Sequence, residues 1–344
     1  MTRTPVPAAP PPGRRAVLVS LAGIAVAGCS RHTPQPASRT ARQSGTPAPS
    51  ASRPAPASSS PSPASASSAL PHTTPWRPTS AEVQPAAKLR AVQLVEAIGA
   101  WAAGRGGAAA ARARVAALGL PSGLVGQAGP LLPAADQAAL QVVDAQYGGI
   151  LSRSASVLVV CRQWTRHGGT VRAGGTTLDV RLSASGGAWT VDALHPARPG
   201  PAARSLASDV RAALADDRIV LPPAAAADLR SGQVHSSVAR AMLALARTYR
   251  LEVSVVRSGH PLDVFGTSRP SDHPRGRAFD VWRIDGHAVV DPATPRSLIE
   301  RFMRDAAAAG SYNVGGPVLL SGGGADQFFS DATHHDHVHV GFRT

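Results

Sequence analysis

The stretch Ser271–Asp280 reads Ser-Asp-His-Pro-Arg-Gly-Arg-Ala-Phe-Asp, and a second stretch, His334–His339, reads His-His-Asp-His-Val-His. Together they place three carboxylates and five imidazoles within about seventy residues. These groups bind borderline-soft cations such as zinc. We therefore interpret the rest of the chain as an export signal, a tether and a spacer domain that deliver this site to its place of action.

Both stretches contain strand-like segments, in which alternate residues point to the same face. His337 and His339 should therefore point one way and the two valines the other. Asp280 should point away from the core that Phe279 enters. Gly276 would let the preceding loop turn back, so that a loop histidine faces the strand bearing Asp280. Two histidines and one aspartate are then available as ligands, and a fourth position is left for water.

Two patterns in these stretches resemble the signature of the LAS-type zinc peptidases. They are the S-x-H-x-x-G-x-A-x-D pattern of Ser271–Asp280 and the H-x-H pattern of His337–His339. The family includes lysostaphin-like enzymes, D-Ala-D-Ala carboxypeptidases and dipeptidases, and the hedgehog signalling domain. The resemblance covers about residues 235–344. It implies an α+β domain with a small antiparallel sheet and flanking helices.

The resemblance also implies roles for single residues. It implies His273, Asp280 and His339 as zinc ligands, and His337 as the residue that handles the proton of the attacking water. Arg257, at a strand end before the first motif, is similar to the arginine that polarises the substrate carbonyl.

Three further residues complete this comparison with the family. His334 and Ser271 are similar to accessory residues near the metal. Carboxypeptidase-type members carry a glutamate general base, and no acidic residue here matches it, because Asp336 should point to the opposite face from His337. A histidine can act as base near neutral pH, and zinc lowers the pKa of its own water.

Other assignments of the histidines remain open. The chain could hold a three-histidine site at His334, His337 and His339, although that site would leave the first motif unexplained. A further group is expected on loops or at the surface: His260, His287 and His335.

The N-terminal segment, residues 1–29, has the features of a targeting signal. A basic region with Arg14-Arg15 precedes a short apolar run that is too short to span a bilayer. The run ends in Val26-Ala-Gly-Cys29, which resembles a bacterial lipobox with Cys29 as the lipidated residue. We expect a lipid anchor on the extracytoplasmic side of the cell membrane. The alternative is an ordinary secretory signal, and the paired arginines leave both Sec and twin-arginine export open.

Residues 30–79 are rich in Ser, Pro, Ala and Thr. Such a composition buries too little apolar surface to offset the entropy of the chain, so we expect a disordered tether with polyproline II character.

Residues 80–198 are predicted to form a small α+β domain without chemistry of its own. The order of its elements is similar to that of a cone-shaped nuclear-transport-factor-like domain. Cys161 should be an inert buried thiol, and His167 and His195 should be exposed. Helices are predicted over 81–103, 108–118 and 133–145, and strands over 155–164, 176–182 and 189–194.

Residues 199–344 are predicted to form the zinc peptidase-like domain, after a Pro-rich boundary at 196–201. Its helices are expected at 202–216, 222–230, 237–249 and 294–309. Its strands are expected at 251–256, 278–284, 288–290, 318–320 and 337–342.

The formal charge of +14 is carried almost wholly by arginine, and Lys88 is the sole lysine. Arginine is spread along the chain without aromatic interleaving, which argues against nucleic acid as a partner. The charge would suit an anionic wall polymer, but a general compositional bias explains it equally well. We expect a monomer.

The sequence thus predicts a zinc-dependent peptidase that hydrolyses peptide stems of peptidoglycan. Whether it is a carboxypeptidase, dipeptidase or endopeptidase stays open. One alternative is a non-catalytic zinc-containing lipoprotein that binds or senses the cell wall, and another is a tethered scaffold without metal.

Overall fold

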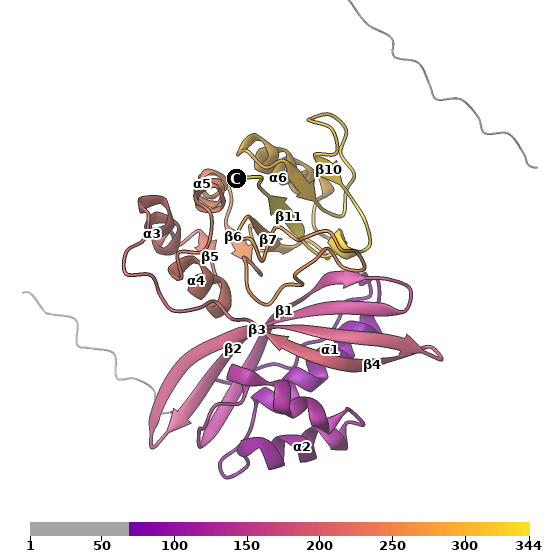
Figure 1. The fold of residues 1–344 in the computed structure, drawn as a ribbon, viewed down its shortest axis with the longest axis vertical. Coiled ribbons are helices and arrows are strands. Elements are labelled where there is room, and N and C mark those ends of the chain that lie inside the picture. The colour runs from indigo at the N-terminus through magenta and orange to yellow at the C-terminus, as the bar shows by residue number, and fades with distance from the viewer. Residues whose placement is uncertain (1–68) are drawn as a thin grey trace, which may run out of the picture. The chain divides into compact units, whose positions relative to one another are not determined.

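The structure is a computed structural model that describes residues 69–344. The chain divides into two units, Met1–Ser62 and Pro63–Thr344, and all described residues belong to the second. This unit is mixed α/β and contains two sheets (Figure 1). Its buried apolar side chains form two large hydrophobic cores. The predicted signal, its Cys29 and most of the predicted tether lie outside the described residues. None of the helices in residues 69–344 is both long and apolar enough to cross a bilayer.

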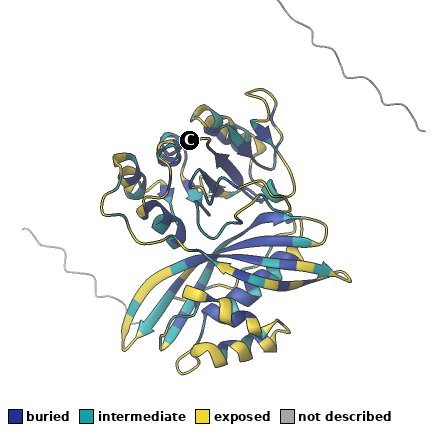
Figure 2. Cartoon of the chain, in the orientation of Figure 1, coloured by how far each residue is buried: buried dark blue, intermediate teal, exposed yellow. Residues whose placement is uncertain are grey.

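The first sheet and its helices occupy residues 69–198, here called the upstream module. Its helical elements are α1 (Pro85–Gly99), α2 (Gly107–Ala117), η1 (Ser122–Gln127) and η2 (Gly129–Leu131). An antiparallel meander follows, with β1 (Gln137–Ile150), β2 (Ser154–His167), β3 (Thr170–Ser185) and β4 (Ala188–Pro196). The apolar side of α1 packs on one face of this meander and forms one core with it. Burial therefore follows the inner faces of helix and sheet (Figure 2).

Two predictions for this part of the chain are wrong. The segment 133–145 was expected to be a helix, but it contributes to β1, which pairs along its length with β2. Its alanines and glutamines favour a helix locally, whereas Ala138, Leu140 and Val142 alternate as buried residues and satisfy a sheet. The tether was expected to reach residue 79. Instead, the backbone of Thr74 exchanges hydrogen bonds with the side chain of Gln141, so the chain is already packed there.

Three residues of the upstream module that were predicted to have no role in a site lie where the sequence predicted. Cys161 is fully buried, and burial raises the pKa of its thiol to about 12. His167 and His195 are exposed. None of the three contributes to a site.

The second sheet and its helices occupy residues 199–344, here called the downstream module. Its helices are α3 (Ser208–Ala215), α4 (Pro223–Arg230), α5 (Ser236–Ala246), α6 (Arg296–Ala308) and the short η3 (Thr333–His335). Its strands are β5 (Ile219–Val220), β6 (Leu251–Val253), β7 (Ala278–Ile284), β8 (His287–Ala288), β9 (Asn313–Gly315), β10 (Phe328–Phe329) and β11 (Val338–Gly341). The order in the sheet is β10-β9-β11-β7-β6-β5, with β8 paired to β7.

The pairing in this sheet is mainly antiparallel, but β5–β6 and β9–β10 are parallel. The expected helix over 202–216 is shorter than predicted, since it begins at Ser208. The expected strand over 318–320 is absent, and β9 lies a few residues earlier.

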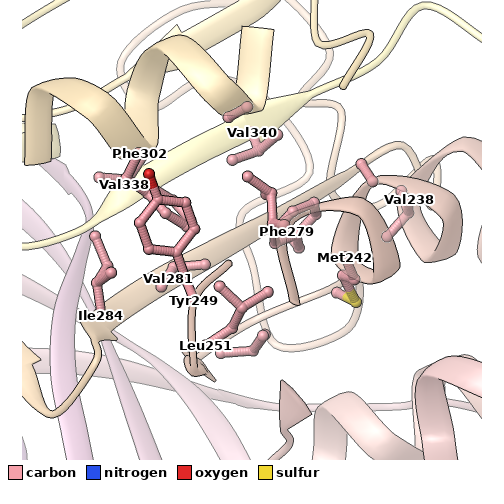
Figure 3. Close-up of a cluster of buried hydrophobic side chains, with 14 of the residues drawn as sticks. Val238, Met242, Tyr249, Leu251, Phe279, Val281, Ile284, Phe302, Val338 and Val340 are labelled. Carbon is pink, nitrogen blue, oxygen red and sulfur yellow. The ribbon is translucent and has the colours of Figure 1, made fainter. Parts of the chain in front are cut away.

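The two central strands of this sheet have one apolar and one polar face. Phe279 and Val281 of β7 and Val338 and Val340 of β11 are fully buried in the core beneath α5 and α6 (Figure 3). Alternation then places the side chains between them on the other face of the sheet, as the sequence predicted. The core of the downstream module thus fixes which residues can face a shared site.

Candidate metal centre

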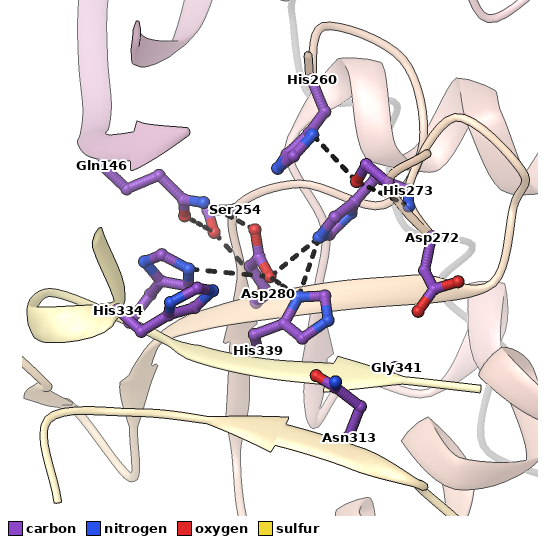
Figure 4. A network of polar contacts seen from close by, with 12 residues as sticks. Gln146, Ser254, His260, Asp272, His273, Asp280, Asn313, His334, His339 and Gly341 are labelled. Carbon is purple, nitrogen blue, oxygen red and sulfur yellow. Dashed lines mark hydrogen bonds and ion pairs between the residues drawn. The ribbon is translucent and has the colours of Figure 1, made fainter. Parts of the chain in front are cut away.

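Three side chains meet on the polar face of β7 and β11. Nε2 of His273, Oδ1 of Asp280 and Nδ1 of His339 lie 3.1 Å from one another in all three pairs (Figure 4). Ligands at about 2.0–2.1 Å in a tetrahedral zinc site are separated by roughly 3.3–3.4 Å, close to this triangle. The residues predicted as zinc ligands therefore come together with a spacing that suits a small cation.

Local backbone structure accounts for this convergence. His339 on β11 is paired directly with Asp280 on β7, which brings their side chains to the same place on the sheet. His273 comes from a loop that returns through Gly276, whose φ of 70° favours glycine. Nδ1 of His273 donates to the carbonyl of Val256 at 2.8 Å, so Nε2 keeps its lone pair for the site.

The electrostatics of the triangle also favour a cation. Asp280 is fully buried; burial alone would raise the pKa of its carboxyl, but His273 and His337 hold that pKa well below its usual range. Burial lowers the pKa of His339 to about 4, which keeps the imidazole neutral. The carboxylate of Asp280 and the imidazoles of His273 and His339 thus converge on one point, an arrangement that a bound cation would stabilise.

A fourth imidazole, His260, belongs to the same cluster. His260, His273 and Asp280 offer ligand atoms that all lie within 4.8 Å of one another, so this group could hold a metal ion. The ring of His260 stacks on that of His273, with centroids 4.1 Å apart. The sequence placed His260 on a loop or at the surface; it lies on a loop, but it is half-buried and faces the site.

His337 stands beside the triangle, with Nε2 3.8 Å from Oδ1 of Asp280. Its Nδ1 lies 2.6 Å from Oδ1 of Asp336. Asp336 was predicted to point to the opposite face, and this prediction is wrong. Asp336 precedes β11 and has φ −107° and ψ −2°, so the alternation of a strand does not apply to it. Burial alone would lower the pKa of His337, but Asp280 and Asp336 outweigh it and raise that pKa to about 8.

The upstream module contributes to the site, although it was predicted to carry no chemistry. Nε2 of Gln146 on β1 donates to Oδ2 of Asp280 at 2.6 Å. Oε1 of the same amide accepts from Oγ of Ser254, which fixes the orientation of the amide. Gln146 thus occupies the carboxylate oxygen that does not face the triangle.

A cavity of about 500 Å³ opens over the triangle and is lined by both modules. Its walls include Tyr147 and Leu151 from the upstream module and Phe265, Tyr312 and Phe329 from the downstream module. This is the size of a small-ligand or peptide-residue pocket.

Comparison with known proteins gives no match: no family model, no curated protein and no solved structure matches this chain. The likeness to LAS-type peptidases therefore remains a prediction from two motifs.

The predicted accessory residues both line the cavity. Ser271 is buried and lies 3.4 Å from Nδ1 of His260. Nδ1 of His334 lies 2.8 Å from Oδ1 of Asp331, and its ring contacts Phe329 edge-on. The pairing with Asp331 leaves Nε2 of His334 available in the cavity, so the alternative of a three-histidine site stays open.

Arg257 does not line the cavity, and its predicted role at the substrate carbonyl is not supported. Its guanidinium donates to the carbonyl of Pro199 at 2.8 Å and lies 3.8 Å from Asp228. The side chain is held at the connection between the modules because that connection supplies a carbonyl and a carboxylate. Among the described residues that line the cavity, the one arginine is Arg269.

The remaining histidines lie outside the cavity. His287 is exposed, and Nε2 of His335 donates to the carbonyl of Ala81 at 2.9 Å. The sequence reasoning missed two contacts from the upstream module: Gln146 donates to Asp280, and Lys88 forms an ion pair with Asp336. One signal was available: the sole lysine of the chain stands in the apolar part of a predicted helix, where a charge needs a buried partner.

Proposed function

We propose that the chain is a zinc-dependent peptidase whose metal is held by His273, Asp280 and His339. The observation that carries this proposal is the triangle of ligand atoms at 3.1 Å, with His337 beside it. We also propose that the downstream module has a hedgehog/D-Ala-D-Ala peptidase-like fold, and that the upstream module is a nuclear-transport-factor-like cone.

A zinc ion at this position would polarise a carbonyl and lower the pKa of a water molecule. The chain itself supplies the proton carrier. Nδ1 of His337 is engaged by Asp336, so Nε2 is the nitrogen free to accept a proton next to Asp280. The aromatic walls of the cavity would exclude water around the scissile bond, and Arg269 in its lining would pair with a substrate carboxylate.

For the substrate we propose the peptide stems of cell-wall peptidoglycan. Support comes from the likeness of the two motifs to the LAS-type signature and from the lipobox-like segment ending at Cys29, which would tether the enzyme to the outer face of the membrane. Carboxypeptidase and endopeptidase activities remain two versions of this proposal.

The test is an assay of the chain after Cys29 on stem peptides, with products identified by mass spectrometry. We expect turnover that a chelator abolishes and zinc restores. His273→Ala should be inactive, and His337→Ala should lose about 10²- to 10⁴-fold in kcat. His287→Ala is the matched control, because His287 is exposed and outside the cavity. Turnover that survives both the chelator and His273→Ala would refute the proposal.

A second candidate is a zinc-containing protein that binds or senses the wall without cleaving it. The observation that favours it is the composition of the cavity, whose described lining contains no glutamate to serve as the general base of carboxypeptidase-type members. One zinc per chain by elemental analysis, together with binding but no cleavage of every stem peptide, would favour this candidate.

A further inference from the structure

The sole lysine of the chain, Lys88, is buried where the two modules meet. It lies on α1, its side chain is 1% exposed, and it forms ion pairs with Glu82 and with Asp336. The distance from Nζ to Oδ2 of Asp336 is 2.7 Å. Lys88 of the upstream module is therefore paired with Asp336, which belongs to the second histidine-rich motif of the downstream module.

Asp336 is held at both oxygens. Oδ2 accepts from Nζ of Lys88 and from the backbone N–H of Tyr147, at 2.7 and 3.0 Å. Oδ1 accepts from Nδ1 of His337 at 2.6 Å. Both groups on Oδ2 come from the upstream module, so that module determines how the carboxylate faces His337.

This arrangement fixes the tautomer of His337. Burial alone would raise the pKa of Asp336, but Lys88 and His337 lower it, so the carboxylate is ionised and only accepts hydrogen bonds. The proton of a neutral His337 then resides on Nδ1, and Nε2, which lies 3.8 Å from Oδ1 of Asp280, is the nitrogen that can accept a proton.

A purely structural role is a poor explanation for this ion-pair chain. Removing charged groups from water is costly, and apolar side chains of similar volume often stabilise such a position better. The contacts are also specific, because the chain of paired groups that begins at Lys88 ends at the imidazole of His337, beside the candidate ligands.

We propose that Lys88 and Asp336 are positioning residues for His337, through which the upstream module completes the catalytic site. Lys88 holds Asp336, and Asp336 holds His337 in the tautomer that can accept a proton at Nε2. This inference rests on the proposed peptidase function for its kinetic consequences, but the tautomer itself does not depend on catalysis.

The first test is nuclear magnetic resonance of ¹⁵N-histidine-labelled, metal-free chain, titrated upward in pH until the imidazole signals show neutral rings. The spectrum of His337→Gln identifies its signals. We expect the Nδ1–H tautomer in the wild type and a mixture of tautomers in Lys88→Met. If the wild type already has the Nε2–H tautomer, the proposal is wrong, whether or not any variant folds.

The second test is kinetic. Asp336→Asn, and Lys88→Met combined with Glu82→Gln to avoid an orphaned carboxylate, should each lower kcat about 10- to 100-fold with little change in KM. His335→Ala is the matched control, because it removes another hydrogen bond between the modules without touching Asp336. Unchanged kcat in both variants would overturn the proposal. A wild type without turnover would refute the peptidase function alone, and the tautomer measurement would then decide.

Discussion

His260 and His339 are rival candidates for the third ligand beside His273 and Asp280. Nδ1 of His339 lies 3.1 Å from both, whereas His260 lies ring-to-ring against His273 and donates from Nδ1 to the carbonyl of Pro261 at 3.0 Å. Ligands of one small ion must converge on a point, and stacked rings direct their nitrogens in parallel. The geometry therefore favours His339 as the ligand and His260 as a neighbour that orients His273.

Loss of a residue that only orients a metal ligand typically weakens metal binding about 10- to 100-fold. We expect His260→Ala to weaken zinc binding within this range and His339→Ala to weaken it more. Competition with a chromophoric chelator measures both affinities. Comparison of the two variants identifies the third ligand. A larger loss of zinc affinity in His260→Ala than in His339→Ala would assign that position to His260.

The raised pKa of His337 makes the metal-free chain sensitive to pH. With a folded pKa of about 8 against an ordinary value of 6.5, the protonated imidazole stabilises the fold below about pH 6.5. That contribution is lost as the pH rises through about 8, and the shift corresponds to on the order of 2 kcal/mol. Urea unfolding in the presence of a chelator should show this decline between about pH 7 and 8.5.

His337→Gln should remove the decline, because glutamine does not titrate. Asp144 titrates in a lower range, since burial raises the pKa of its carboxyl to about 7. A raised carboxyl pKa makes stability fall from the ordinary value up to about pH 8, so the difference between the wild type and His337→Gln isolates the contribution of His337. An equal decline in His337→Gln would show that another group is responsible.

At the scale of elements, the loop that carries His273 depends on Gly276. Its φ is +70°, and a Cβ there would lie 2.1 Å from the carbonyl oxygen of Gln233. Gly286 in the turn between β7 and β8 has a similar φ of +83° but open space around its Cα. The two glycines separate backbone strain from steric conflict.

Gly286→Ala should cost about 1–2 kcal/mol for the left-handed backbone alone. Gly276→Ala should cost about 2–5 kcal/mol, because the clash with Gln233 adds to the same strain. Urea unfolding of the two variants measures the difference in the free energy of unfolding. Equal losses would mean that the loop shifts freely and does not fix His273.

Elements with a two-residue period were predicted well. Alternation in β7 and β11 placed Phe279 and Val340 in the core and Asp280 and His339 on the opposite face. Prediction failed where local preference and tertiary pairing disagree, as in β1, and where a turn interrupts the period, as at Asp336. Periodicity describes a strand only between its ends, and Asp336 lies just before the first residue of β11.

At the scale of the molecule, the sequence could not predict which residues meet across the modules. Gln146 is separated from Asp280 by 134 positions, and no local pattern marks an amide as the partner of a distant carboxylate. The two motifs predicted which side chains meet on the polar face of one sheet, because the order of residues along β7 and β11 determines that face. The support around the ligands depends on the packing of a second sheet against the first, which only the structure shows.

This dependence gives a prediction about the whole molecule. Gln146→Leu removes the 2.6 Å hydrogen bond to Oδ2 of Asp280 and leaves that buried oxygen without its partner. A free oxygen lets the carboxylate rotate away from the triangle, so zinc affinity should fall about 10- to 100-fold. Gln141→Leu is the control on the same strand, because its amide contacts only Thr74 and the carbonyl of Val142. Equal zinc affinity in the two variants would mean that the upstream module covers the site without supporting it.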